Sequence, residues 1–172
     1  MSHDFKVQAA DYLATVLHPT TRAKIMRRLV RKGRELDREV PFEAIAFTGN
    51  SGLLVGPELA SRLDKALILV HKNRDTTRHC SNWMVEGPRG KALRYVFVDD
   101  LIATGKTLFR TKQTIDEGPQ GHELVGLLLY GSTYTDPAPL LIRYENRGGY
   151  PAYSLTLPWR SAYRTGERDL IW

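Results

Sequence analysis

Continuous apolar runs and amphipathic segments alternate along most of this chain. Each run is short and uninterrupted, which is typical of a strand covered on both faces, as in a parallel sheet. Strands that alternate with helices predict right-handed crossovers and a largely parallel sheet. We therefore expect an α/β fold with a mostly parallel central sheet flanked by helices. The predicted strands are 44–47, 66–70, 95–98 and 124–130.

The segments between these runs have the periodicity of helices that bury one face. The second of them is predicted to begin at a cap formed by Thr20 or Thr21, and the last is ended by Gly118 and Pro119. The predicted helices cover 5–17, about 20–34, 53–63 and 105–116.

The helix predicted over 20–34 has a strongly basic face. Its apolar stripe is Ile25, Met26, Leu29 and Val30. A basic helix face is usually a solvated face, and a contact with RNA, DNA or another subunit is the alternative. No aromatic residue interleaves with the cations, which argues against single-strand binding. The cations are Arg22, Lys24, Arg27, Arg28, Arg31, Lys32 and Arg34.

The character of the chain changes at residue 136, where prolines, glycines and tyrosines become frequent. We expect one domain over 1–172, with a core of about 20–135 and a small hood or cap over about 136–172. Residues 1–19 could contribute to that cap. It is expected to contain a strand at 153–157, which residues 158–160 end.

Composition narrows the class of protein. With 42% apolar and 26% charged residues in 172, a single folded domain is expected. No apolar run approaches about 18 residues and the first residues lack a signal-peptide pattern, so we expect a cytoplasmic protein without a membrane span. Cys80 is the only cysteine, which excludes an internal disulfide and a Cys-rich zinc site. The net charge of +6 fits a nucleic acid or a polyanionic small molecule as ligand.

Two carboxylates and a phosphate-type turn follow the strand at 95–98. Asp99 and Asp100 come first, and the turn 104–107 then opens a helix. In a parallel sheet, ligands bind at the carboxyl ends of strands, where these residues would lie. Backbone N–H groups at a helix N-terminus suit a phosphate, whereas carboxylates suit sugar hydroxyls or a divalent cation. The pattern therefore predicts a phosphorylated sugar as ligand.

Other phosphate and hydrolase motifs do not fit. Gly105-Lys106-Thr107 resembles the end of a P-loop, but Asp100 stands where that motif needs glycine. A dinucleotide fingerprint and a zinc-binding histidine pair are both absent from the sequence. The small-residue loop 48–52 is not a serine-nucleophile elbow, because Leu53 replaces the required glycine.

The segment 96–107, V-F-V-D-D-L-I-A-T-G-K-T, resembles the phosphoribosyl pyrophosphate (PRPP) binding motif of type I phosphoribosyltransferases. The supporting likeness extends over residues 42–131, in order and spacing. A polar segment from 73 to about 88 lies where that family has its flexible loop. We expect it to be an active-site lid, with a surface hairpin as the alternative.

The resemblance implies a role for each matching residue. Asp99 and Asp100 would hold the ribose hydroxyls, and Mg²⁺ would be bound mainly through substrate, with these two carboxylates as candidate ligands. The other groups follow as sets. The catalytic residues would be Asp99, Asp100, Lys72 and Glu86. The 5′-phosphate would be bound by Ala103, Thr104, Gly105, Lys106 and Thr107, and the base by Leu101, Ile102 and Trp159. The pyrophosphate would be bound by Thr48, Gly49, Asn50, Ser51, Gly52, Lys72, Arg74 and Arg78.

The implied activity is a Mg²⁺-dependent transfer of ribose 5-phosphate from PRPP to a nucleobase, giving a nucleoside 5′-monophosphate and pyrophosphate, as in nucleotide salvage. Ala103 stands where enzymes for 6-oxopurines carry an acid, so the motif resembles adenine enzymes most, with Glu86 as proton donor. Lysine-rich motifs of orotate enzymes are not found. Trp159 could stack on the base or act as a hydrophobic anchor. The family resemblance also implies a homodimer.

A protein of a different class remains the alternative. Some proteins of this fold bind PRPP or nucleotides as regulators and contact nucleic acid, and the basic helix would suit that role.

Overall fold

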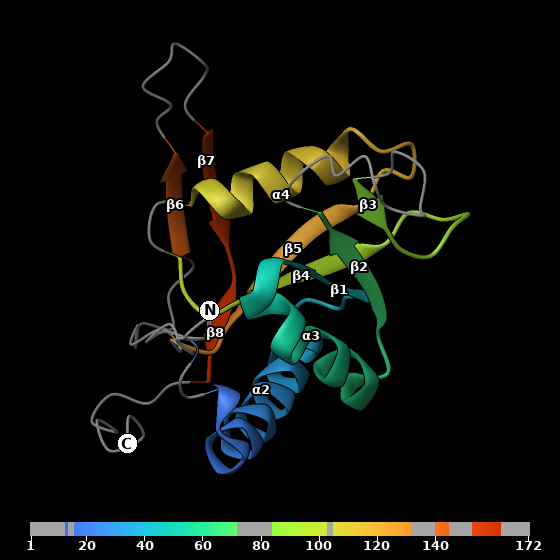
Figure 1. Ribbon diagram of the computed structural model, residues 1–172. Coiled ribbons are helices and arrows are strands. Elements are labelled where there is room, and N and C mark those ends of the chain that lie inside the picture. Colours follow the sequence, from blue (N-terminus) through green and yellow to red (C-terminus); the bar gives the residue numbers. More distant parts are fainter. Residues whose placement is uncertain are drawn as a thin grey trace, which may run out of the picture.

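A computed structural model describes residues 13, 16–71, 84–102, 105–131, 140–144 and 153–162. Six strands form the main sheet in the order β3-β2-β1-β4-β5-β8 (Figure 1). The edge strand β3 is antiparallel to β2, and the other strands run parallel. The predicted α/β fold with a mostly parallel sheet is confirmed. The strands are β1 (Ala44–Thr48), β2 (Ala66–Val70), β3 (Val85–Glu86), β4 (Arg94–Asp99), β5 (Glu123–Leu129) and β8 (Trp159–Ser161).

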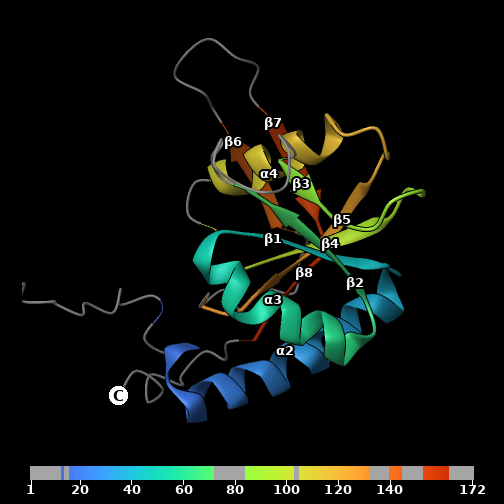
Figure 2. The ribbon, with the colours of Figure 1, turned by 45° about the vertical axis from the view of Figure 1, so that its right-hand side comes forward.

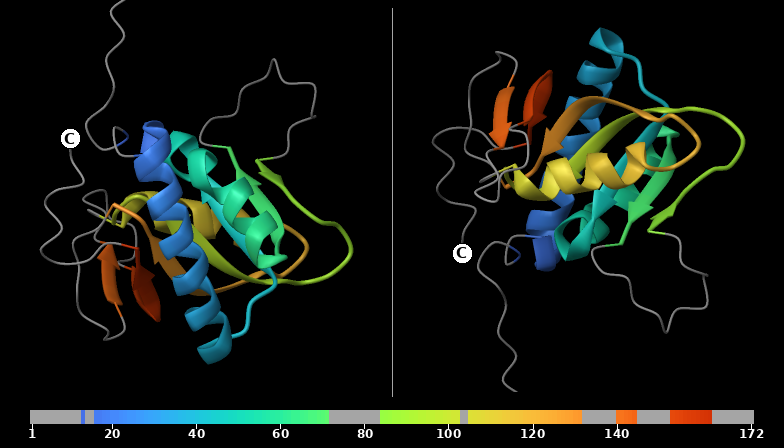
Figure 3. Two further views of the ribbon diagram at one scale, coloured as in Figure 1. Left: turned by 90° about the horizontal axis from the view of Figure 1, so that it is seen from below. Right: turned by 90° about the horizontal axis from the view of Figure 1, so that it is seen from above.

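Both faces of the sheet are covered, which explains the continuous apolar runs at 44–47, 66–70, 95–98 and 124–129. Helices α2 (Pro19–Glu39) and α3 (Gly49–Leu63) lie on one face (Figure 2). Helix α4 (Lys106–Asp116) lies on the other, beside a hairpin of β6 (Leu140–Tyr144) and β7 (Tyr153–Leu157). In the view from below, α2 and α3 lie in front of the sheet, and in the view from above, α4 lies in front of it (Figure 3).

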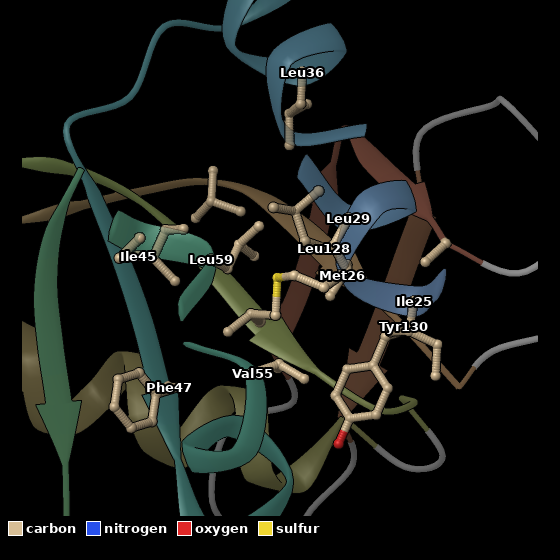
Figure 4. Packing of buried hydrophobic residues seen from close by; sticks show 14 of the residues in the cluster. Ile25, Met26, Leu29, Leu36, Ile45, Phe47, Val55, Leu59, Leu128 and Tyr130 are labelled. Carbon is tan, nitrogen blue, oxygen red and sulfur yellow. The ribbon is translucent and has the colours of Figure 1, made fainter. Parts of the chain in front are cut away.

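The apolar stripe of α2 fills the core on its side of the sheet. Ile25, Met26 and Leu29 pack with Val55 of α3 and Leu128 of β5 (Figure 4). Val30 is only partly buried at the rim of this cluster. The predicted apolar stripe of the helix is thus confirmed in its first three residues.

Helix α2 differs from the prediction at both ends. It begins at Pro19, with His18 as its N-cap, because proline is preorganised for a first helical position. The predicted threonine cap is wrong: the Thr21 hydroxyl donates to the His18 carbonyl oxygen at 3.1 Å. The helix continues to Glu39 because Leu36, which is fully buried, extends the apolar stripe by two turns.

The predicted loop 48–52 is mostly the first turn of α3, which begins at Gly49. A Cβ on Gly52 would come within 2.6 Å of the Cβ of Phe47, so only glycine allows this turn to lie so close to β1. The small residues therefore bring a helix N-terminus close to the sheet, instead of forming an open loop.

The chain after Pro158 forms a further strand. β8 adds to the main sheet, and Trp159 pairs with Leu127 of β5. The prediction that 158–160 simply ends the strand at 153–157 is therefore incomplete, and this part of the segment predicted as a cap lies in the core sheet. Of the helix predicted over 5–17, only residues 13, 16 and 17 are described, and Val16 is fully buried.

Among the described residues, none of the helices combines the length and the apolar character that a membrane crossing requires.

Candidate functional site

The candidate site lies at the carboxyl edge of the parallel strands. β1 ends at Thr48 and leads directly into α3, while β4 ends at Asp99 and is followed by Asp100 and the start of α4. Because β1 and β4 are adjacent and parallel, their ends meet at one edge. The structure thus brings the predicted diacid and the first turn of α3 together.

Asp99 is the most constrained carboxylate of this edge. Its side chain is buried, its Oδ1 accepts a hydrogen bond from the Ser51 hydroxyl at 2.6 Å, and the same oxygen accepts one from the Asp100 backbone N–H at 2.9 Å. Burial raises the pKa of Asp99 to about 7; the hydrogen bond from Ser51 lowers the pKa in part, and the neighbouring Asp100 raises it. This carboxyl group therefore gains or loses a proton near neutral pH.

The backbone around the diacid is tied to the end of β5. The Tyr130 N–H donates to the Asp99 carbonyl oxygen at 3.1 Å, and the Gly131 N–H donates to the Asp100 carbonyl oxygen at 2.7 Å. The Tyr130 hydroxyl also donates to the Ser51 carbonyl oxygen at 3.0 Å. The backbone carbonyls of both acidic residues are consequently fixed to the end of β5, and Tyr130 also contacts the first turn of α3.

Helix α4 presents its N-terminus beside the diacid. Gly105 is its N-cap and has a φ of 73°, in the left-handed region that glycine occupies readily. Lys106 and Thr107 are exposed, and the first turn contains no acidic residue. A first turn of this kind, with backbone N–H groups and one ammonium, can bind a phosphate.

The first turn of α3 is a second anion-binding candidate. It contains no acidic residue, and Thr48, its N-cap, uses its hydroxyl to donate to the Val70 carbonyl oxygen at 2.7 Å. The side chain of Thr48 is therefore occupied in joining the ends of β1 and β2. Anion binding at this turn would rest on backbone N–H groups, with Asn50 exposed nearby.

A pocket of about 520 Å³ lies between α4 and the end of β2. Lys106, Thr107 and Arg110 line it from α4, and His71 lies among the lining residues from the β2 side. Arg110 was not predicted as a site residue. Its spacing of four from Lys106 places both cations on one face of the helix, and this is the signal that could have indicated it.

Glu86 makes a hydrogen-bond contact with His71 that the sequence did not reveal. Its Oε1 lies 2.5 Å from His71 Nε2, across the antiparallel pair of β2 and β3. The His71 backbone N–H also donates to the Met84 carbonyl oxygen at 2.9 Å. The end of the segment predicted as a lid, residues 85–86, thus pairs with β2 as an edge strand.

The predicted base-binding residues differ in how far they are buried. Leu101 is exposed and Ile102 is buried, both next to the diacid. Trp159 is only 4% exposed and packs in the core cluster on the α4 side, as expected of a hydrophobic anchor. Lys72, Arg74, Arg78, Ala103 and Thr104 lie outside the described residues.

The described residues contain no group of three or more His, Cys, Asp or Glu side chains that could hold a metal ion. Asp99 and Asp100 are a pair only. Such a pair fits Mg²⁺ that is bound largely by substrate oxygens and water, since Mg²⁺ rarely uses an all-protein cage.

Comparisons with known proteins agree with this geometry. The crystal structure of orotate phosphoribosyltransferase from Aeropyrum pernix matches with a TM-score of 0.53 and 25% identity, over 67% of this chain and 62% of that chain. The chain has the type I phosphoribosyltransferase fold. Adenine phosphoribosyltransferase from Saccharomyces cerevisiae matches with a TM-score of 0.54 and 21% identity, over 67% of this chain and 70% of that chain.

Curated sequences point to the same fold family. Orotate phosphoribosyltransferase from Listeria monocytogenes serotype 4b is 26% identical over 117 residues, which is 68% of this chain and 53% of the relative. The chain thus spans about half the length of that relative. No protein-family profile matches the chain. The resemblance to type I phosphoribosyltransferases inferred from residues 96–107 is confirmed.

Proposed function

We propose that this protein is a Mg²⁺-dependent phosphoribosyltransferase that joins a nucleobase to PRPP and releases pyrophosphate. The observation that carries the proposal is the position of Asp99 and Asp100 beside two helix N-termini, those of α3 and α4. A ribose with phosphate groups at both ends needs hydroxyl-binding carboxylates between two anion sites. The relatives named above are enzymes of this class.

Each part of the edge has a task in this transfer. The first turn of α4, with Lys106 and Thr107, holds the 5′-phosphate, and the first turn of α3 holds the pyrophosphate. The carboxylates of Asp99 and Asp100 accept hydrogen bonds from the ribose hydroxyls. Mg²⁺, when bound, neutralises charge on the pyrophosphate oxygens.

In the reaction the bond from C1′ to the pyrophosphate oxygen breaks, its electron pair leaves with pyrophosphate, and a base nitrogen forms the new bond to C1′. The hydrogen on that nitrogen leaves as a proton, to pyrophosphate or to solvent. The sugar becomes cationic in the transition state, so the protein acts mainly by electrostatics and by exclusion of water. Buried carboxylates next to the sugar stabilise that positive charge.

The acceptor that we test first is adenine, because Ala103 stands where an acid would serve a 6-oxopurine. Orotate is tested beside it, because the curated relatives are orotate enzymes. The assay measures pyrophosphate release from PRPP with adenine, hypoxanthine, guanine, xanthine, orotate and uracil, with and without Mg²⁺. Turnover with one base that disappears without Mg²⁺ supports the proposal. PRPP binding with no turnover on any base would refute the transferase proposal and favour a regulator.

Two further properties belong to this proposal. A cytoplasmic location and a homodimer are expected from the family resemblance. Sedimentation equilibrium of the purified protein measures the second, and a mass equal to one chain at all concentrations would contradict it.

A further inference from the structure

Helix α2 carries almost the whole net charge of the chain. Between Pro19 and Glu39 there are eight Lys or Arg residues and three acidic residues, a net charge of +5, against +6 for all 172 residues. The transferase proposal uses none of these cations.

Five of the cations form one line along the helix. Their spacing alternates between three and four residues, which places them on one face. All five side chains are exposed, and the buried residues of α2 occupy the opposite side. We call this line the basic stripe, and it consists of Lys24, Arg27, Arg31, Arg34 and Arg38.

The acidic residues of α2 leave most of the stripe uncompensated. Asp37 pairs with Lys65, and Glu39 pairs with Arg160 of β8. Glu35 lies closer to Lys32, at 2.8 Å, than to Arg31, at 3.9 Å. Three cations of the stripe, Lys24, Arg27 and Arg34, form no ion pair among the described residues.

The shape and chemistry of the stripe fit one kind of polyanion. Its 14 residue steps span about 21 Å. Four of its five cations are arginines, whose guanidinium groups bind phosphate in a bidentate manner. No aromatic side chain lies within α2 to stack on bases, so contacts would be to the phosphate backbone only. An anionic membrane fits less well, because the apolar face that a surface helix inserts is already packed in the core.

We propose that the basic stripe is a docking surface for the phosphate backbone of a nucleic-acid duplex, without preference for base sequence. This surface lies on the outer side of α2 and not at the carboxyl edge that holds the diacid. Its function is therefore separate from PRPP chemistry, and either proposal can fail alone.

The test compares two triple variants that lose the same charge. Lys24→Gln, Arg27→Gln and Arg34→Gln remove stripe cations that have no ion pair among the described residues, and glutamine keeps the helix propensity. The control replaces three exposed cations away from α2, Arg62→Gln, Arg89→Gln and Lys91→Gln. Fluorescence anisotropy follows binding of labelled duplex DNA and duplex RNA of about 20 base pairs, between about 50 and 200 mM salt.

The wild-type protein and the control are expected to bind a duplex with a steep salt dependence. The stripe variant is expected to bind at least about tenfold more weakly at about 50 mM salt, with a salt slope reduced by about 2 to 3. The single variant Arg27→Gln is expected to reduce that slope by about 1.

Equal weakening in both triple variants would overturn the proposal, because net charge and not position would then govern binding. The proposal would also be overturned if the wild-type protein bound neither duplex, even if it bound vesicles that contain phosphatidylserine. Pyrophosphate release, measured in parallel, is expected to be the same in the stripe variant and the wild type.

Discussion

The hydroxyl of Ser51 lies 2.6 Å from Oδ1 of Asp99, although the two residues are 48 positions apart in the chain. This hydrogen bond joins the first turn of α3 to the carboxylate at the end of β4. The Tyr130 hydroxyl also holds this turn, because it donates to the Ser51 carbonyl oxygen at 3.0 Å. A hydrogen bond therefore connects the proposed pyrophosphate site to the proposed ribose site.

Replacing Ser51 by alanine is expected to raise the pKa of Asp99 further, because the lost hydrogen bond favours the ionised form. A bond to a charged group contributes about 1.5–3 kcal/mol, which corresponds to a shift of about one to two pH units. PRPP affinity measured against pH should then rise at higher pH than in the wild type. Ser61→Ala, on an exposed position of the same helix, is the control. An unchanged pH profile in Ser51→Ala would contradict the link.

The raised pKa of Asp99 also predicts how stability depends on pH. The native state holds this proton up to about pH 7, whereas the unfolded chain releases it near its usual value of 3.8. The contribution of Asp99 to stability is therefore complete below about pH 4 and is lost as the pH rises through 7. A single group such as Asp99 can change the free energy of unfolding by no more than about 1.4 kcal/mol per pH unit.

Urea unfolding of the wild type and of Asp99→Asn between these pH values isolates this contribution. The free energy of unfolding of the wild type should fall relative to that of the variant as the pH rises. A difference that is constant with pH, or that grows in the opposite direction, would show that Asp99 titrates normally.

Gly105→Ala is expected to weaken PRPP binding, because the left-handed φ at the N-cap of α4 becomes strained and the phosphate-binding turn shifts. Gly121→Ala is a matched control, since Gly121 also has a left-handed φ, of 68°, and lies away from the site. Both variants should lose about 1–2 kcal/mol of stability. Isothermal titration with PRPP should detect a loss of affinity only in Gly105→Ala, and equal affinities would argue against a phosphate at this turn.

Lys106→Gln is expected to lower PRPP affinity by about tenfold or more, as a charge-assisted contact to phosphate is removed. Lys112→Gln lies on the same helix and loses the same charge, but its side chain pairs with Asp116 at the far end of α4. Its PRPP affinity should stay close to that of the wild type. If both variants bind PRPP equally, then Lys106 is not at the 5′-phosphate.

The elements at the centre of the sheet could be predicted from the sequence because local pattern and tertiary environment agree there. Residues 95–98 of β4 are continuously apolar and fully buried, and the two carboxylates that follow them lie at the sheet edge. The diacid and the α4 N-terminus were therefore predicted together with their strand.

Other features depend on contacts distant in sequence. Glycine, asparagine and serine favour a loop locally, yet residues 49–52 are helical because Gly52 packs against Phe47. The pair of His71 and Glu86 depends on the register of β2 and β3, and the bond from Tyr130 to Ser51 joins positions 79 residues apart. A three-residue strand such as β8 carries too little pattern to be recognised.

The central claim is that Asp99 and Asp100 hold the ribose of PRPP, and calorimetric titration of PRPP in the presence of Mg²⁺ tests it most directly. The double variant Asp99→Asn, Asp100→Asn is compared with Asp64→Asn, Asp116→Asn, which loses the same charge at two exposed positions. We predict that the first pair loses PRPP affinity by about a hundredfold while the second binds like the wild type. Unchanged affinity in the first pair would contradict the assignment of the site.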